Sequence, residues 1–143
     1  MPPPYVCAIL QDEDTGDLLV EQRPPSSTAA PGKLTCFGGK RERGEQPLPA
    51  LLRELQEELG WQPETPTRAV DLFVDEKLVA WFFTAAAPRV DVELAFEDGH
   101  HGVRMSVDDL LADARLSEWH RAVLVAWQAG LSAAGYRTPS VPE

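Results

Sequence analysis

The alternation of apolar and polar residues predicts two β-hairpins in the first two thirds of the chain. Residues 5–10 and 18–23 are apolar, β-prone runs, and the sequence QDEDTGD between them contains the Asp, Thr and Gly typical of turns. Residues 68–74 and 77–87 flank an Asp-Glu turn in the same way. Residues 33–39, KLTCFGG, predict one further short strand that ends on two glycines.

Leucines at helical spacing predict a helix over residues 47–59. Pro47 and Pro49 fit the first turn, where backbone N–H groups have no partner within the helix. Gly60 is suited to end the helix, because glycine readily adopts the left-handed conformation common at that position. At about 100° per residue, one face of this helix is expected to carry Leu48, Leu51, Leu52, Leu55 and Leu59.

The C-terminal part of the chain mixes short elements. The expected segments are a loop with a short strand over 88–102, a last strand over 103–106, a short helix over 107–113 capped by Ser106, and a final helix over 116–135 capped by Ser117. Residues 137–143 are expected to be a flexible tail. Because strands and helices mix without a repeat, the fold class is α/β (α+β) with a mixed sheet. The length suits one domain, over residues 1–136.

Composition and charge exclude several classes of function. The formal net charge is −10, and no cluster of Lys and Arg could follow a phosphate backbone, so no polymeric nucleic acid is expected as a partner. No apolar run approaches the roughly 20 residues that span a membrane, and the N-terminus lacks the pattern of a secretory signal. We therefore expect a cytoplasmic protein with no membrane partner. Cys7 and Cys36 lie in apolar runs without metal-ligand spacing, which indicates reduced, buried thiols.

Acidic residues are concentrated around the predicted helix. Residues 38–61 contain Glu42, Glu45, Glu54, Glu57 and Glu58, and the last three share a helical face that differs from the leucine face. Like charges three or four residues apart on a helix each cost about 0.2–0.5 kcal/mol. A bound divalent cation would offset this repulsion, since Mg²⁺ and Mn²⁺ prefer hard oxygen ligands.

The spacing of residues in this stretch forms a specific motif. Gly39 is followed after five residues by Glu45, and after seven more by RELQEELGW, which begins at Arg53 and contains Gly60. The pattern resembles the signature of the Nudix hydrolases, G-x5-E-x7-R-E-U-x-E-E-x-G-U with U a bulky apolar residue, at every specified position. A chance match in a chain of this length has a probability on the order of 10⁻⁷. The resemblance implies a Nudix fold, in which the mixed β-sheet is sandwiched between helices.

The resemblance also implies roles for the residues of the motif. The expected catalytic residues and ligands of an Mg²⁺ cofactor, with Mn²⁺ as an alternative, are Glu54, Glu57 and Glu58. Of these, Glu57 and Glu58 are the strongest candidates. Glu45 and Arg53 are expected to form an internal ion pair that braces the loop against the helix, and Gly60 permits a backbone turn that a side chain would obstruct.

Residues outside the helix complete the set of candidates. In several relatives in the family a carboxylate from a late loop can act as general base, and Glu97 has such a position. His100 and His101 in the same loop are alternative acid–base groups. The expected substrate-binding residues, at the end of the second strand and in the paired-glycine segment, are Arg23, Gly39 and Lys40.

Aromatic and polar residues elsewhere bear on substrate specificity. Trp81 and Phe83 alternate with Phe82 along one strand, so either face could stack on a base, with core packing as the alternative. Ser117 stands near the place where relatives that destroy oxidised guanine nucleotides carry a base-reading amide, so that specificity is not implied. Gln46 stands where many relatives have Ser or Thr as the helix cap.

The expected function is that of a Mg²⁺-dependent Nudix hydrolase that cleaves a pyrophosphate linkage in a nucleoside diphosphate derivative. A nucleoside triphosphate, ordinary or oxidised, leads the small nucleotide substrates because the chain lacks the extra domain or long insertions of many nucleotide-sugar enzymes. ADP-ribose, other nucleotide sugars and dinucleoside polyphosphates are alternatives. A non-catalytic nucleotide-sensing domain is disfavoured because all the metal glutamates are retained. An isoprenoid diphosphate isomerase would need a dedicated cysteine, for which Cys36 is a weak candidate. A homodimer is compatible with the sequence.

Overall fold

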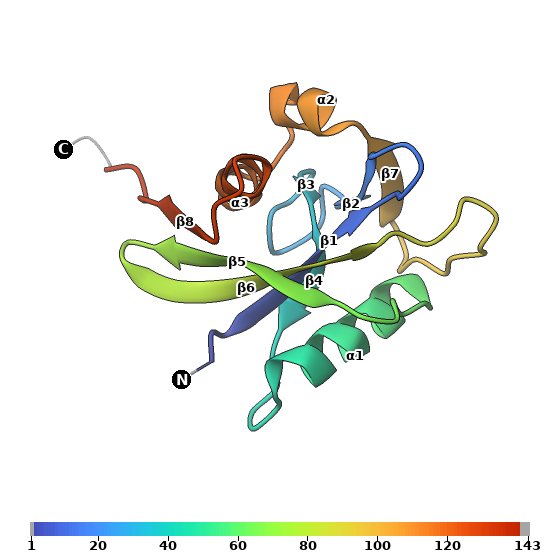
Figure 1. Ribbon diagram of the computed structural model, residues 1–143, viewed down its shortest axis with the longest axis horizontal. Helices are drawn as coiled ribbons and strands as arrows, with labels where there is room; N and C mark the ends of the chain where they lie inside the picture. Colours follow the sequence, from blue (N-terminus) through green and yellow to red (C-terminus); the bar gives the residue numbers. More distant parts are fainter. Residues whose placement is uncertain (1, 141–143) are drawn as a thin grey trace.

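The computed structural model describes residues 2–140 and consists of one mixed β-sheet with helices on both faces (Figure 1). This arrangement confirms the expected fold class. The elements are β1 (Tyr5–Gln11), β2 (Leu18–Gln22), β3 (Leu34–Thr35), β4 (Phe37–Lys40), α1 (Pro47–Leu59), β5 (Thr67–Val74), β6 (Lys77–Ala86), β7 (His101–Met105), α2 (Val107–Ala112), α3 (Glu118–Gln128) and β8 (Ala133–Tyr136).

The eight strands form one sheet with β1 near its centre. The main path runs in the order β3-β2-β1-β6-β5-β8, and β4 pairs with β1 while β7 pairs with β2. Both expected hairpins are present, because β1–β2 and β5–β6 pair antiparallel. The pairs β1–β6 and β5–β8 are parallel, and the other pairs are antiparallel.

The sheet separates two hydrophobic cores. The core on one face includes α1, and the core on the other includes α2 and α3, so the two layers of helix seen in Figure 1 each cover one face. Side chains of a strand alternate between faces. In β6, Phe82 packs in the core under α3, whereas Phe83 and the partly buried Trp81 pack on the face of α1.

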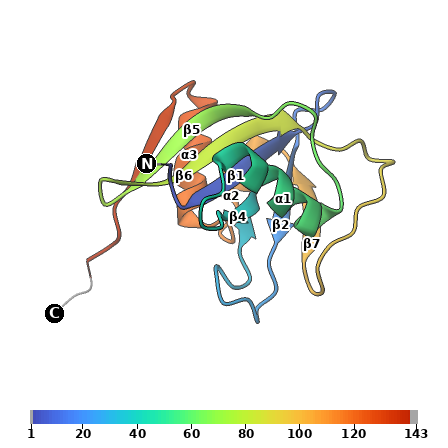
Figure 2. The same ribbon diagram turned by 90° about the horizontal axis from the view of Figure 1, so that it is seen from below.

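Helix α1 has the expected bounds, but the expected apolar face is wrong in part. Gly60 ends the helix with φ 64°, a left-handed conformation that glycine adopts without steric cost. Leu48 is 40% exposed, whereas Ala50 and Glu58 are buried. The buried face is rotated toward Glu58 because α1 packs on β4, whose paired glycines have no side chains to hold the helix away (Figure 2).

Two predictions of strand and helix boundaries are corrected by the structure. The single strand expected over 33–39 is divided into β3 and β4, which pair with β2 and β1 respectively on either side of Cys36. The expected final helix over 116–135 ends at Gln128, and Gly130 then adopts φ 76°. The last strand is therefore β8 rather than residues 103–106, of which 103–105 belong to β7 and Ser106 caps α2. The Ala and Gly residues of β8 carry no alternating pattern, and pairing with β5 makes them a strand.

The C-terminal segment follows β8. Within the tail expected over 137–143, Thr138 donates its backbone N–H and its hydroxyl to the carboxylate of Asp75 in the β5–β6 turn, at 3.0 and 2.8 Å. Residues 141–143 lie outside the described residues. In the described part of the chain, no helix has the length and apolar character needed to cross a membrane.

Candidate active site

The paired glycines of β4 bring two glutamates of α1 against the sheet. The Gly38 N–H donates to Glu58 Oε1 at 3.0 Å. Gly38 has φ 149°, and a Cβ there would lie 2.2 Å from the Val6 carbonyl oxygen. A Cβ on Gly39 would lie 2.5 Å from the carboxyl carbon of Glu54. A side chain at Gly38 would therefore clash with the backbone of β1, and a side chain at Gly39 would push the Glu54 carboxylate away from β4.

Burial and mutual repulsion disfavour the charged forms of these glutamates. Burial, followed by repulsion from Glu21 and Glu54, raises the pKa of Glu58 from its ordinary 4.5 to about 9. Burial also raises the pKa of Glu54, against the opposing effect of Arg53. Because burial disfavours the charged forms of both carboxylates, a hard divalent cation beside them would favour their ionised forms.

Arg53 occupies the centre of the acidic network. Its Nε lies 2.8 Å from Glu45 Oε2, so the expected ion pair between loop and helix is present. Its Nη1 also lies 3.0 Å from Glu54 Oε1 and 3.3 Å from Glu57 Oε2. Hydrogen bonding to Arg53 lowers the pKa of Glu45 to about 2. Arg53 therefore screens Glu54 and Glu57 from one another as well as bracing the loop.

The three glutamates expected as metal ligands differ in environment. Glu58 is buried and Glu54 half-buried, whereas the Glu57 side chain is 54% exposed and points to Arg53. Among residues 2–140, no group of three His, Cys, Asp or Glu side chains is arranged as a ready-made metal site. Glu57 must turn away from Arg53 before all three carboxylates can share one cation.

A buried carboxylate on β2 belongs to the same region and was missed by the sequence analysis. Glu21 is 2% exposed, and it is one of the charges that raise the pKa of Glu58. Its Oε1 accepts a hydrogen bond from Arg23 Nη1 at 2.8 Å, and its Oε2 lies 2.9 Å from His100 Nδ1. An acidic residue that directly follows three buried apolar residues in a strand is the signal that could have identified it.

The loop before β7 brings Glu97 near the helix. Its negative charge contributes to the raised pKa of Glu58, and its Oε2 lies 3.8 Å from His100 Nε2. The two adjacent histidines differ: His100 points inward to Glu21, whereas His101 is exposed and begins β7. Of the two, only His100 faces other charged groups of the site in the described structure.

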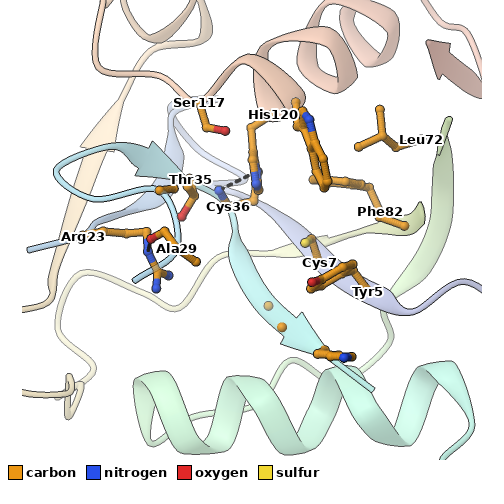
Figure 3. Close-up of a pocket in the computed structure, with 16 residues that line it drawn as sticks. Tyr5, Cys7, Arg23, Ala29, Thr35, Cys36, Leu72, Phe82, Ser117 and His120 are labelled. Atoms are coloured by element: carbon orange, nitrogen blue, oxygen red, sulfur yellow. Dashed lines mark hydrogen bonds between the residues drawn. The ribbon is translucent and has the colours of Figure 1, made fainter. Parts of the chain in front are cut away.

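A cavity of about 510 Å³ lies beside β4, between α3 and the loop over residues 24–33 (Figure 3). It brings together the three expected substrate-binding residues, Arg23, Gly39 and Lys40. Its apolar wall includes Phe82 and Leu72. Trp81 and Phe83 lie on the opposite face of the sheet, so Phe82 is the aromatic residue of β6 available to a ligand here.

His120 gives this cavity a polar group that the sequence did not indicate. Its Nδ1 accepts the backbone N–H of Cys36 at 3.1 Å, and its ring meets Phe82 edge-on at 5.3 Å (Figure 3). Burial, with a smaller contribution from Arg23, lowers the pKa of His120 to about 4. The neutral ring therefore carries its hydrogen on Nε2, for which the described residues provide no acceptor.

Two hydroxyl groups line the same cavity. Thr35 Oγ1 is buried and has no hydrogen-bond partner within residues 2–140. Ser117 precedes α3 but its side chain makes no capping bond, in contrast to Ser106, which caps α2 as expected. Gln46 likewise makes no side-chain cap for α1. The hydroxyl of Ser117 thus remains available to a ligand, whereas that of Thr35 is buried in the wall of the cavity.

The Arg53 network leads to a prediction about stability. Replacing Arg53 with Ala is expected to lower the melting temperature by roughly 3–6 °C, since it leaves Glu45 and Glu54 without their shared partner. Thermal denaturation of the metal-free protein measures the effect. Arg43→Ala, in the exposed part of the same loop, is the matched control. An unchanged melting curve together with lost hydrolysis would instead place Arg53 in contact with substrate.

The raised pKa of Glu58 predicts a dependence of stability on pH. The folded protein favours the neutral carboxyl, so this contribution is fully present below pH 4.5 and is lost as the pH rises toward about 9. In a chelator, Glu58→Gln is therefore expected to melt close to wild type at pH 4.5 and at least about 5 °C higher at pH 9. Glu64→Gln, an exposed loop residue, is the control. Parallel curves for wild type and Glu58→Gln would contradict the raised pKa.

Comparisons with known proteins agree with this geometry. The family model described as NUDIX domain matches residues 1–127. An 8-oxo-dGTP diphosphatase of Escherichia coli (strain K12) is 33% identical over 108 residues, which cover 73% of this chain and 81% of the relative. The MutT protein of Methanosarcina mazei Go1 superposes with a TM-score of 0.72 at 23% identity, covering 90% of this chain and 94% of that one. The E. coli ORF135 protein gives 0.63 at 26% identity, covering 90% and 91%.

Proposed function

Because this chain belongs to the Nudix hydrolase family, we propose that it hydrolyses a nucleoside triphosphate, ordinary or oxidised, to a nucleoside monophosphate and pyrophosphate. The observation that carries this proposal is the cavity beside β4, whose lining combines apolar side chains such as Phe82 and Leu72 with the polar groups of Arg23, Gly39 and Lys40. The similarity to an 8-oxo-dGTP diphosphatase supports the same substrate class.

The cavity offers separate places for the parts of a nucleotide. A base against Phe82 would meet an aromatic ring and the Nε2–H of His120, which can donate to a carbonyl or ring nitrogen of the base. The hydroxyl of Ser117 can donate or accept. Phosphates would then extend toward Arg23 and Lys40, whose charges oppose the surplus of acid around them.

Glu54, Glu57 and Glu58 would hold the cation, and Mg²⁺ is the ion we propose, with Mn²⁺ as an alternative. When bound, such an ion neutralises phosphate charge and lowers the pKa of a bound water. The oxygen-only ligand set and the high pKa of Glu58 fit this role, since a cation favours the ionised carboxylate that burial disfavours. The Gly38 N–H orients the Glu58 carboxylate on β4.

Glu97 is the proposed general base. It lies on a loop near Glu58 and its side chain is 53% exposed, so it can reach a water molecule at the phosphates. It would accept the proton of the attacking water while the water oxygen bonds to phosphorus and the bridging P–O bond breaks.

Arg23 is held by Glu21, and by Ser27 and Ala29 in the neighbouring loop.

The test is a hydrolysis screen with identification of both products. Purified protein is incubated with Mg²⁺ and a panel of nucleoside triphosphates, 8-oxo-dGTP, ADP-ribose, nucleotide sugars and dinucleoside polyphosphates. We expect the highest kcat/KM for a triphosphate, with monophosphate and pyrophosphate as products. A higher value for ADP-ribose or a nucleotide sugar would reassign the substrate, and tight binding of nucleotides without turnover of any compound would indicate a sensing domain.

A further inference from the structure

The buried carboxylate of Glu21 connects the two loops that border the proposed site. Its two oxygens lie 2.8 Å from Arg23 Nη1 and 2.9 Å from His100 Nδ1. A buried charge is costly unless it is paired and hydrogen-bonded, and these two partners satisfy Glu21 from both sides. The His100 side chain is itself only 15% exposed. The bond to Glu21 therefore fixes the direction of the imidazole ring.

The other nitrogen of this ring faces Glu97. With the carboxylate of Glu21 as acceptor, His100 Nδ1 carries a hydrogen and donates it. Nε2 then lies 3.8 Å from Glu97 Oε2. An imidazolium attracts the carboxylate form of Glu97, and a neutral ring can accept a hydrogen bond from the protonated form. The ring therefore complements Glu97 both before and after a proton transfer.

The loop itself is anchored on either side of Glu97. Phe96 packs against Phe37 with ring centroids 6.3 Å apart, and Gly102 leaves space for it, since a Cβ there would lie 2.6 Å from Phe96 Cζ. These apolar contacts hold the backbone but not the exposed Glu97 carboxylate. Within residues 2–140, His100 is the only charged or titratable group paired with that carboxylate. Without it, the side chain would sample several rotamers.

We propose that His100, oriented by Glu21, is a positioning residue that holds the Glu97 carboxylate toward the acidic face of α1. The inference rests on the proposed role of Glu97 as general base. A general base acts only within hydrogen-bond reach of the proton that it removes, so a freely rotating carboxylate lowers turnover. Because Glu97 is proposed as the base and not as a substrate contact, the effect is expected on kcat rather than on KM.

A double-mutant cycle between His100 and Glu97 tests the proposal. In His100→Asn the amide N–H can still donate to Glu21, while the Nε2 that faces Glu97 is lost. We expect kcat to fall about 10-fold in this variant, with KM changed less than about 2-fold. In a Glu97→Gln background the same replacement is expected to change kcat less than about 2-fold, because His100 acts through Glu97.

Controls separate positioning from a general loss of structure. Asp98→Asn changes an exposed residue of the same loop and is expected to leave kcat unchanged. Glu21→Gln leaves the ring in place but weakens the bond that orients it, and its loss of kcat is expected to be larger in the wild-type background than in Glu97→Gln, where only its effect through Arg23 remains. Melting temperatures identify a temperature at which every variant is folded. Circular dichroism at that temperature confirms the folded state before kinetics.

The outcomes distinguish this inference from the proposed function. An unchanged kcat in His100→Asn overturns the inference. Losses of kcat in His100→Asn and Glu21→Gln that are the same in the wild-type and Glu97→Gln backgrounds also overturn it, because they indicate an effect independent of Glu97. If Glu97→Gln alone keeps wild-type turnover, the general-base role fails first and the inference fails with it. A low kcat in Glu97→Gln, together with an effect of His100→Asn that is smaller in the Glu97→Gln background than in the wild type, supports both the general-base role of Glu97 and the positioning role of His100.

Discussion

Replacing Glu58 or Glu57 with Gln is expected to lower kcat by roughly 10³-fold, the largest effect among the changes considered. A bound divalent cation contributes several kcal/mol to stabilising charge in phosphoryl transfer, and about 1.4 kcal/mol corresponds to tenfold in rate. Glu58 is the more constrained of the two, because its carboxylate is buried and held by the Gly38 N–H. Steady-state kinetics over a range of Mg²⁺ concentrations measures the loss.

Binding of the cation can be followed separately from turnover. Mg²⁺ or Mn²⁺ is expected to raise the melting temperature of the wild-type protein, since a ligand that binds only the folded state stabilises it. This increase is expected to be smaller in Glu57→Gln and Glu58→Gln. Glu64→Gln, exposed after α1, removes the same charge and is expected to respond like wild type. Equal increases in all four proteins would exclude the two residues as ligands.

Replacing Glu97 with Gln is expected to lower kcat by roughly 10² or more, the magnitude of losing a general base. Mg²⁺-dependent nucleotide binding is expected to remain nearly intact, because Glu97 is not among the proposed cation ligands. Asp98→Asn, the adjacent exposed acid, is the matched control and is expected to keep wild-type turnover. Kinetics at several Mg²⁺ concentrations distinguishes the two roles, since loss of a ligand shifts the Mg²⁺ dependence of the rate.

Wild-type turnover in Glu97→Gln would remove that residue from catalysis. The base would then be sought at Glu54, His100 or His101. A pH–rate profile that loses its limb near the ordinary imidazole pKa on His→Gln replacement would identify a histidine. The position of His100 between Glu21 and Glu97 would make it the first of the two histidines to replace.

Local sequence determined α1 and its motif. Two prolines at the start, leucines at helical spacing and Gly60 at the end specify the bounds of this helix without reference to the rest of the chain. The hairpins β1–β2 and β5–β6 are local in the same sense, because a turn joins consecutive strands. The spacing of the glutamates likewise identified the family, since it reflects chemistry carried by one short segment.

Tertiary structure alone decided which faces and which distant residues meet. Most residues of β8 are predicted by the sequence to belong to the final helix, and only parallel pairing with β5 makes them a strand. Glu21 and His120 gain their character from burial and from partners 79 and 84 positions away in the sequence, His100 and Cys36. Periodicity reports the structure of a segment, whereas the burial of a carboxylate and its pKa depend on the other segments that pack around it.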